Sequence, residues 1–320
     1  MPILPGRLNQ TPHLAPELDD ADLGRLLRQL NKPGRMKRVL DVALISAFLD
    51  GTGNDWDRRS HRISVLAQFV AATEIASAWL AQEPHSADAL VFHSWVDLAR
   101  GLRTRRLEDA SQMVSNCYEA ADLRPDDPLP WIALLGAARI ERYRQRDVDS
   151  IWREATGRDR WNREAYLQML GYLSPQEGGS SPQVLDFIDV VRPRIPADAP
   201  CAAAELTAYV RQYQGLVGQG GVQALTAREL WIGQPVAAAL DKASVMWVKP
   251  DFFGHAAALA DLNVLAYALC AAGRAPDAAG AFRLLRAKVT YWPWHFDGAA
   301  VTEFEQQRAR STRSRSRRTF

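Results

Sequence analysis

The sequence predicts an all-α fold built from antiparallel helical hairpins that stack on one another. Apolar residues recur at helical spacing through most of the 320 residues, and no segment shows the alternating pattern of a convincing strand. Alanine, leucine and arginine dominate the composition, which favours helices. The stretch 262–285 has the pattern of two amphipathic helices joined by a turn at Gly273.

The predicted helices follow one another through short breaks. Pro33 and Gly34 end the first of them, and the sequence RPDDP at 124–128 separates two others, because proline stops a helix interior. The expected helices cover residues 19–32, 36–49, 60–81, 86–102, 107–121, 129–143, 147–155, 163–173, 184–191, 202–216, 222–231, 236–247, 252–272, 277–289 and 298–308. Residues 291–296, YWPWHF, are expected to pack as an aromatic plug over the last hairpin.

Proline and charge divide the chain into five parts. Residues 1–17 contain four prolines and are expected to form a flexible N-terminal arm. Two helical-repeat regions follow, 18–191 and 201–307, joined by a Pro-rich connection at 192–200. Residues 308–320 form an Arg/Ser segment without the apolar residues needed to fold alone, so we expect a disordered tail.

Charge, cysteine content and hydropathy exclude several classes of protein. The net charge is +2, but six arginines lie in the tail, so 33 basic and 37 acidic residues remain in the mildly acidic body. The three cysteines lie far apart in the sequence and form no CxxC motif, which argues against a disulfide framework. We see no signal peptide and no apolar run long enough for a transmembrane segment, and we therefore expect a cytoplasmic protein.

The last hairpin resembles a tetratricopeptide repeat. Leu262, Leu265, Ala266 and Leu269 match the first helix of that motif, Gly273 matches its turn, and Ala278 and Phe282 match its second helix; Leu285 stands where alanine is usual. The segment 161–180 is similar to one in uncharacterised actinobacterial helical-repeat proteins, a similarity that implies no activity. The resemblance implies a short, degenerate tetratricopeptide-like solenoid, since such hairpins bury their faces by stacking on neighbours.

No catalytic, metal or cofactor motif stands out, so we predict no catalytic residue, no metal and no cofactor. No two histidines pair at helical spacing, and His93 fits a hydrogen-bonded core or boundary histidine better than a ligand. Gly178 and Gly179 precede a helix but lack the strand and lysine of a nucleotide loop. An enzymatic interpretation would need convergent carboxylates or histidines in one deep pocket.

The main functional prediction is a protein-interaction scaffold or adaptor. Tryptophans beside arginines are good anchors for a peptide or an acidic protein segment. The predicted binding residues are Trp131, Arg139, Arg142, Arg160, Trp161 and Arg163. The bland interpretation of these arginines is a solvated face with surface ion pairs.

The alternative is a nucleic-acid-associated helical protein. Arginines in the tail would bind phosphates or another anionic surface, with affinity that falls as salt rises. These arginines are Arg308, Arg310, Arg313, Arg315, Arg317 and Arg318. No aromatic residues are interleaved with them, so stacking on bases is not indicated.

Overall fold

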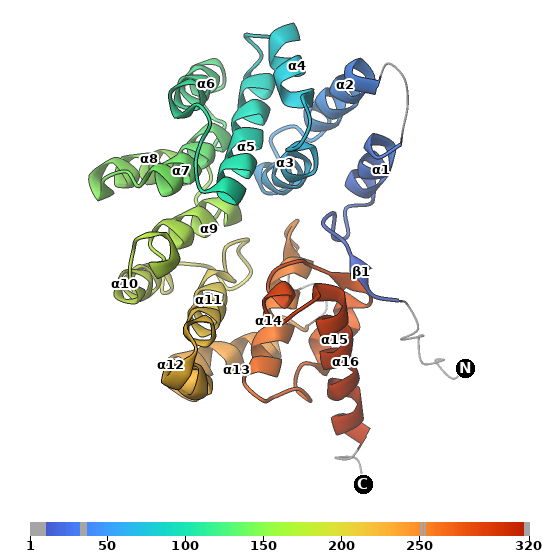
Figure 1. Ribbon diagram of the computed structural model, residues 1–320, viewed down its shortest axis with the longest axis vertical. Coiled ribbons are helices and arrows are strands. Elements are labelled where there is room, and N and C mark those ends of the chain that lie inside the picture. Colours follow the sequence, from blue (N-terminus) through green and yellow to red (C-terminus); the bar gives the residue numbers. More distant parts are fainter. Residues whose placement is uncertain (1–10, 33–36, 250–251, 253, 317–320) are drawn as a thin grey trace. The chain divides into compact units, whose positions relative to one another are not determined.

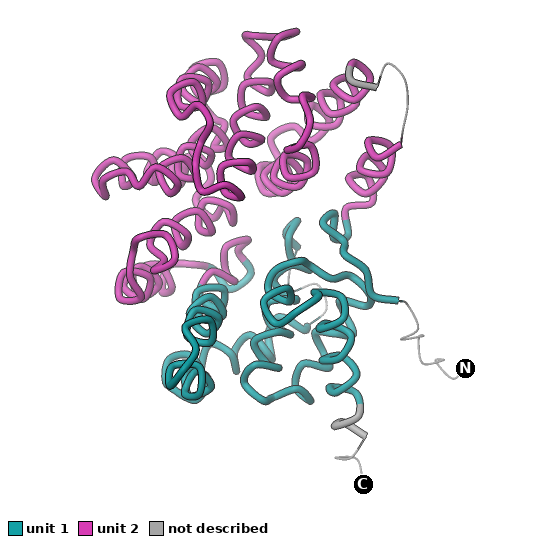
Figure 2. The backbone as a smooth tube through the Cα atoms, viewed as in Figure 1, with its two compact units in different colours: residues 1–19, 196–198, 205–320 teal, residues 20–195, 199–204 magenta. Residues whose placement is uncertain are grey.

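A computed structural model describes residues 11–32, 37–249, 252 and 254–316. The prediction of an all-α protein is confirmed: these residues form 16 α-helices, three 3-10 turns and two strands of two residues each (Figure 1). The chain divides into two compact units (Figure 2). Unit 1 comprises residues 1–19, 196–198 and 205–320, and unit 2 comprises residues 20–195 and 199–204.

Unit 2 is a set of helices in which alternate members pack together. α3 contacts α5, α5 contacts α7, and α7 contacts α9. α6 packs against both α5 and α7, α8 packs against both α7 and α9, and α4 packs against α5 and α2. Its elements are α1 (Ala21–Leu30), α2 (Lys37–Asp50), α3 (Trp56–Val70), α4 (Ile75–Gln82), α5 (Ala87–Thr104), α6 (Ala110–Leu123), α7 (Leu129–Glu141), α8 (Gln145–Arg158), α9 (Arg163–Tyr172), η1 (Pro175–Glu177) and α10 (Ser181–Val191).

A continuous apolar core holds unit 2 together. Trp79 and Phe92 are fully buried and their rings lie 5.6 Å apart, joining α4 to α5. α5 and α7 approach closely at Gly136, where an added Cβ would lie 2.5 Å from Leu98 Cδ1. A side chain at Gly136 would therefore force the buried Leu98 side chain to move in a close-packed core.

Unit 1 contains the predicted last hairpin. Its elements are β1 (His13–Leu14), α11 (Ala204–Gln219), α12 (Gly221–Thr226), η2 (Ala227–Trp231), α13 (Val236–Met246), α14 (Ala258–Ala271), α15 (Ala279–Leu285), β2 (Lys288–Val289), η3 (Trp294–Phe296) and α16 (Ala300–Ser316). The first residue of α11, Ala204, is assigned to unit 2. α14 and α15 pack together, and Gly273 has a φ of +75° in the turn between them. Trp294 of the YWPWHF segment is fully buried against Phe282 and Phe304.

The N-terminal segment differs from the expected flexible arm. Residues 1–10 lie outside the described part, but His13 and Leu14 pair in parallel with Lys288 and Val289. The backbone amide of His13 donates to Ala287 O over 2.9 Å, and that of Ala15 donates to Val289 O over 3.0 Å. The sequence shows no convincing strand at these positions, because two residues are too few to show an alternating pattern.

Two predicted helices differ from the structure in where they break or end. The expected helix 60–81 is interrupted between Val70 and Ile75, and α3 and α4 meet at an angle of 114°. α16 continues to Ser316 and so passes through part of the segment predicted to be a disordered tail, while residues 317–320 lie outside the described part. Ser311 on α16 is fully buried, so tertiary contacts help to hold this polar segment in a helix.

In the described residues, no single helix has both the length and the apolar composition needed to cross a membrane. α3 and α4 satisfy that criterion only when they are taken together, across their 114° bend.

Candidate functional site

The predicted binding residues occupy separate places in unit 2. Trp131 lies in the first turn of α7, whereas Arg139 lies in its last turn and Arg142 directly follows it. Eight residues of helix place Trp131 about 12 Å from Arg139 along the axis. Arg160 and Trp161 lie between α8 and α9, and Arg163 begins α9. The six residues thus come from α7, from the α8–α9 connection and from the start of α9.

Trp131 and Trp161 each pack beside an arginine. The guanidinium of Arg158 lies 4.9 Å from the Trp131 ring centroid, and that of Arg160 lies 4.8 Å from the Trp161 ring. Tyr118 meets the Trp131 ring edge-on at 5.8 Å. These contacts are of the cation–π and aromatic kinds that also occur as ordinary surface packing.

Arg139 and Arg163 form ion pairs inside unit 2. Arg139 binds both carboxylate oxygens of Glu177, and its Nη1 donates to Gln168 Oε1 over 3.1 Å. Arg163 Nη1 lies 3.4 Å from Glu164 Oε1. Arg139 is also largely buried, at 15% side-chain exposure, so its charge is already satisfied by the protein.

The tail arginines are placed only in part. Arg308 donates from Nη1 to Arg286 O over 2.9 Å, and its guanidinium lies 5.8 Å from the Phe304 ring. Arg310 also belongs to the described part of α16, and Arg313 and Arg315 lie in this helix, without described side chains. Arg317 and Arg318 lie outside the described residues.

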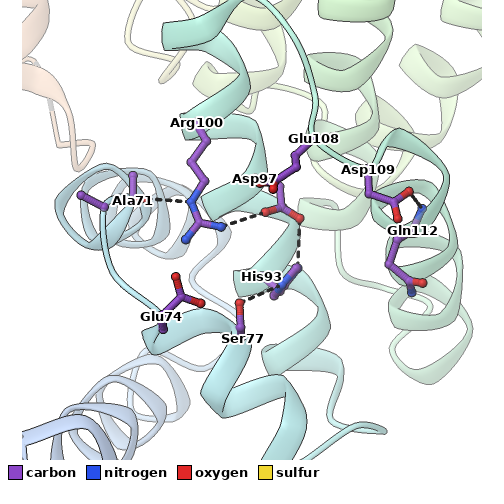
Figure 3. Close-up of a pocket in the computed structure, with 10 residues that line it drawn as sticks. Ala71, Glu74, Ser77, His93, Asp97, Arg100, Glu108, Asp109 and Gln112 are labelled. Atoms are coloured by element: carbon purple, nitrogen blue, oxygen red, sulfur yellow. Dashed lines mark hydrogen bonds and ion pairs between the residues drawn. The ribbon is translucent and has the colours of Figure 1, made fainter.

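A pocket that the sequence did not predict lies on α4, α5 and α6. Its volume is about 660 Å³. α5 forms the base with His93, Asp97 and Arg100, while Glu74 and Ser77 face the pocket from α4 and its start, and Asp109 and Gln112 from the start of α6 (Figure 3). The lining residues are Ala71, Ala72, Glu74, Ser77, His93, Asp97, Arg100, Glu108, Asp109 and Gln112.

The break between α3 and α4 creates one wall of this pocket, and Arg100 holds that break in place. Its Nε donates to Ala71 O and its Nη2 donates to Thr73 O, both over 2.7 Å. Its Nη1 lies 3.4 Å from Asp97 Oδ1. Charge-assisted bonds to two carbonyls of one loop fix the loop against α5, so the pocket wall is pre-organised.

Three polar side chains follow one another along the pocket base. His93 Nε2 lies 3.5 Å from Ser77 Oγ, and His93 Nδ1 lies 3.1 Å from Asp97 Oδ2. The second contact is close enough for an ion pair but lacks hydrogen-bond directionality, because Nδ1 has no partner that satisfies the angular criteria. This agrees with the interpretation of His93 as a boundary histidine with polar partners.

The order hydroxyl, imidazole, carboxylate is also the order of a nucleophilic catalytic triad. A proton relay needs the imidazole to bond both neighbours along its two N–H directions. Here the imidazole–carboxylate contact is off-axis and the serine contact is at the outer limit of a hydrogen bond. The arrangement thus favours a polar binding surface over a nucleophile.

The hydrogen-bonding capacity of the pocket is strongly one-sided. Four carboxylates line it against one guanidinium, that of Arg100. Within the described part of the chain, Glu74 and Glu108 form no ion pair and no side-chain hydrogen bond. Asp109 Oδ1 accepts from the backbone of Gln112 over 2.9 Å, which leaves Asp109 Oδ2 as an open acceptor. The pocket therefore favours a ligand that carries positive charge and several N–H donors.

No family model, curated protein or solved structure is significantly similar to this chain. Among the described residues, no three side chains of the metal-binding types are grouped so as to hold an ion. Fold and site together define an all-α protein of two helical units, one of which carries a pre-organised pocket rich in carboxylates.

Proposed function

We propose that this chain is a protein-interaction scaffold whose unit 2 binds a positively charged, extended segment of a partner protein in the pocket on α4, α5 and α6. One observation carries the proposal: the side chains of this pocket that have no partner in the described residues, those of Glu74 and Glu108, are carboxylates. A basic side chain supplies both the charge and the donors that these acceptors require.

The packing of unit 2 supports an interaction protein of the helical-repeat kind. Alternate helices contact one another along α3, α5, α7 and α9; α6 packs against α5 and α7, and α8 against α7 and α9. Stacked hairpins of this kind commonly present extended binding surfaces. The hairpin of α14 and α15, with its glycine turn, supports the tetratricopeptide-like character that we propose for the fold.

The sign of the partner's charge is the point at which this proposal departs from the initial expectation. Of the arginines predicted to bind an acidic segment, Arg139 is bound to Glu177 and Arg163 lies beside Glu164, so both charges already have partners in the protein. The pocket instead presents carboxylates without partners. A volume of about 660 Å³ is also within the range of sites that enclose a drug-sized ligand, so it accommodates a few residues of a peptide.

The test compares peptides of opposite charge on the full-length chain. Fluorescent peptides of equal length, rich in Arg and Lys or rich in Asp and Glu, are titrated at low and at physiological ionic strength, with fluorescence anisotropy as the readout. The proposal expects binding of the basic peptide only, weakened by salt because the carboxylates at the rim are exposed. Equal binding of the acidic peptide, or no binding of either peptide at low ionic strength, overturns the proposal.

A matched pair of variants ties this binding to the pocket. The variant Glu74→Gln/Glu108→Gln removes two unpaired rim carboxylates. The control Asp186→Asn/Glu305→Gln removes the same charge from exposed positions on α10 and α16. We expect the pocket variant to bind the basic peptide about tenfold more weakly at low ionic strength, and the control to bind it as the original chain does.

A further inference from the structure

We infer that unit 2 carries a second interaction surface, which binds the phosphate backbone of a nucleic acid without sequence preference. This surface, the arginine edge, consists of residues 103–106, at the end of α5 and just after it, and residues 142–146, between α7 and the first turn of α8. None of these residues lines the pocket on α4, α5 and α6. The inference therefore stands or falls independently of the proposed function.

The two segments of the arginine edge are brought side by side by helix packing. α5 and α7 contact each other, and near their C-terminal ends an added Cβ on Gly101 would lie 2.9 Å from Ile140 Cδ1. Just beyond these ends, the backbone amide of Leu107 donates to Glu141 Oε1 over 3.4 Å. The loops that follow α5 and α7 thus adjoin, although α6 and α7 separate them in the sequence.

The arginine edge is dense in positive charge that is largely unpaired. Six of its nine residues are arginines, all six are exposed, and neither segment contains an acidic residue. Arg103 donates to Gln68 O over 2.6 Å, and Arg146 Nε lies 3.4 Å from Asp147 Oδ1. In the part of the chain that the structure describes, no hydrogen bond or ion pair reaches the other four guanidiniums, those of Arg105, Arg106, Arg142 and Arg144.

Two of these arginines hold a backbone conformation that usually belongs to glycine. Arg105 and Arg142 are the C-cap residues of α5 and α7, with φ values of +57° and +55°. A side chain raises the energy of this left-handed conformation, which is why glycine is common at such helix ends. Backbone strain of this kind is concentrated at functional sites. The same unfavourable choice at two adjoining loops indicates that the exposed guanidiniums have a role outside the fold.

The helix dipoles explain only part of this charge. A basic side chain near a helix C-terminus is stabilised by the partial negative charge there, but the effect falls off beyond the last turn. Arg106 and Arg144 lie beyond the last turns of α5 and α7. Their charges therefore remain available to an anionic partner.

A nucleic acid fits the arginine edge better than an acidic protein segment does. A guanidinium binds a phosphate through two parallel N–H···O bonds, and a chain of phosphates is held by such contacts alone. A specific peptide needs apolar or aromatic anchors at the centre of its site. The only aromatic side chain of the arginine edge is the half-buried Tyr143. We therefore assign the contacts to phosphates rather than to bases or side chains.

The experiment titrates the full-length chain with fluorescent oligouridylate and oligothymidylate of equal length, with anisotropy as the readout. An edge variant removes the four unpaired charges and uses glycine where φ is positive: Arg105→Gly/Arg106→Gln/Arg142→Gly/Arg144→Gln. At low ionic strength we expect both oligonucleotides to bind the original chain with similar affinity, because the phosphates are common to them. The edge variant should bind both of them about tenfold more weakly.

A control variant removes four charges from exposed positions outside the arginine edge: Arg28→Gln/Arg153→Gln/Arg194→Gln/Arg283→Gln. It should bind as the original chain does, because these arginines are spread over other elements. The slope of log K against log salt should be shallower by about 3 in the edge variant alone, since each lost phosphate contact of a single strand removes about 0.7. Circular dichroism melting curves verify that each variant is folded.

Several outcomes overturn the inference. They are absence of oligonucleotide binding at low ionic strength, an equal loss of affinity in the control variant, and a loss confined to a variant of the tail arginines. Binding of only one of the two oligonucleotides also overturns it, because phosphates alone would not distinguish them. A fluorescent glutamate peptide of equal charge that binds as tightly as the oligonucleotides would show that the surface recognises acidic protein segments instead.

Discussion

Arg139 and Glu177 form a two-point ion pair that joins the last turn of α7 to η1, with Nε donating to Oε2 and Nη2 donating to Oε1. Arg139 Nη1 also donates to Gln168 of α9. One guanidinium thus connects three elements of unit 2. Arg139 was predicted from the sequence to bind a partner. We conclude that its contacts stabilise the folded unit 2.

Replacing Arg139 by alanine is therefore expected to destabilise unit 2 without affecting ligand binding. The loss of charge-assisted bonds at a largely buried site is expected to lower the free energy of unfolding by about 1–3 kcal/mol. Arg139→Lys should recover only part of this loss, because an ammonium cannot form the two-point pair. Urea denaturation measures the stability, and anisotropy with the basic peptide should show unchanged affinity. A weakened affinity in a folded Arg139→Ala protein would contradict this account.

Asn263 has an equivalent structural role in unit 1. Its fully buried side chain accepts from Trp294 Nε1 over 2.8 Å and donates to Leu259 O over 2.8 Å. Asn263→Ala leaves the indole N–H without its partner, and we expect a loss of about 2–3 kcal/mol in urea denaturation. A double-mutant cycle with Trp294→Phe should show a coupling of about 1 kcal/mol. Strict additivity of the two variants would show that this hydrogen bond contributes nothing.

Asp127 is expected to make the stability of unit 2 depend on pH. Burial raises the pKa of Asp127 from 3.8 to about 6, although its Oδ1 accepts from Leu129 N over 2.8 Å. Because the folded-state pKa lies above the unfolded value, the folded chain holds this proton more tightly. The stabilisation is complete below about pH 4 and is lost as pH rises through about 6, by about 3 kcal/mol in total.

The matching variant is Asp127→Asn, which keeps an oxygen for Leu129 and does not titrate. The stability of Asp127→Asn relative to the original chain should therefore increase from pH 4 to pH 7 and then level off, as measured by urea denaturation across this range. A difference that stays constant with pH would exclude Asp127 as the source.

The C-terminal arginines require a different test from simple deletion. Removing residues 308–320 also removes the buried Ser311 and the bond from Arg308 to Arg286 O, so we expect unit 1 to lose about 1–3 kcal/mol. The substitutions Arg315→Ser, Arg317→Ser and Arg318→Ser remove three of the six arginines and keep Arg308 and Ser311 in place; circular dichroism melting curves serve as the folding control. The nucleic-acid alternative predicts that these substitutions reduce RNA or DNA retention at low salt; unchanged retention would contradict it.

Much of the fold could be predicted because helices leave a local signal. The stripe of Leu262, Leu265 and Leu269 is buried as its spacing predicts, and Gly273 lies in the turn. The break after Val70 could not be predicted, since the residues Ala71-Ala72-Thr73-Glu74 contain neither proline nor glycine. The loop is held by Arg100, about 30 residues further along, and such a contact has no local signature.

The pocket escaped prediction for the same reason. Glu74, Glu108 and Asp109 are unremarkable acids in the sequence, and the fold alone brings them to one cavity. One local signal was present: His93, Asp97 and Arg100 follow at helical spacings of four and three, which places them on one face of α5. Conversely, Trp131 and Arg139 suggested a site by residue type, and they lie in the first and the last turn of α7.

Hydrogen–deuterium exchange of the full-length chain, with and without the basic peptide, tests the central claim most directly. The account predicts that the peptide slows amide exchange in residues 71–77 and 93–112, which include the pocket lining, and that this protection is lost in the Glu74→Gln/Glu108→Gln variant. Binding of the peptide with protection confined to other segments, or with protection that persists in the variant, would contradict a binding site on α4, α5 and α6.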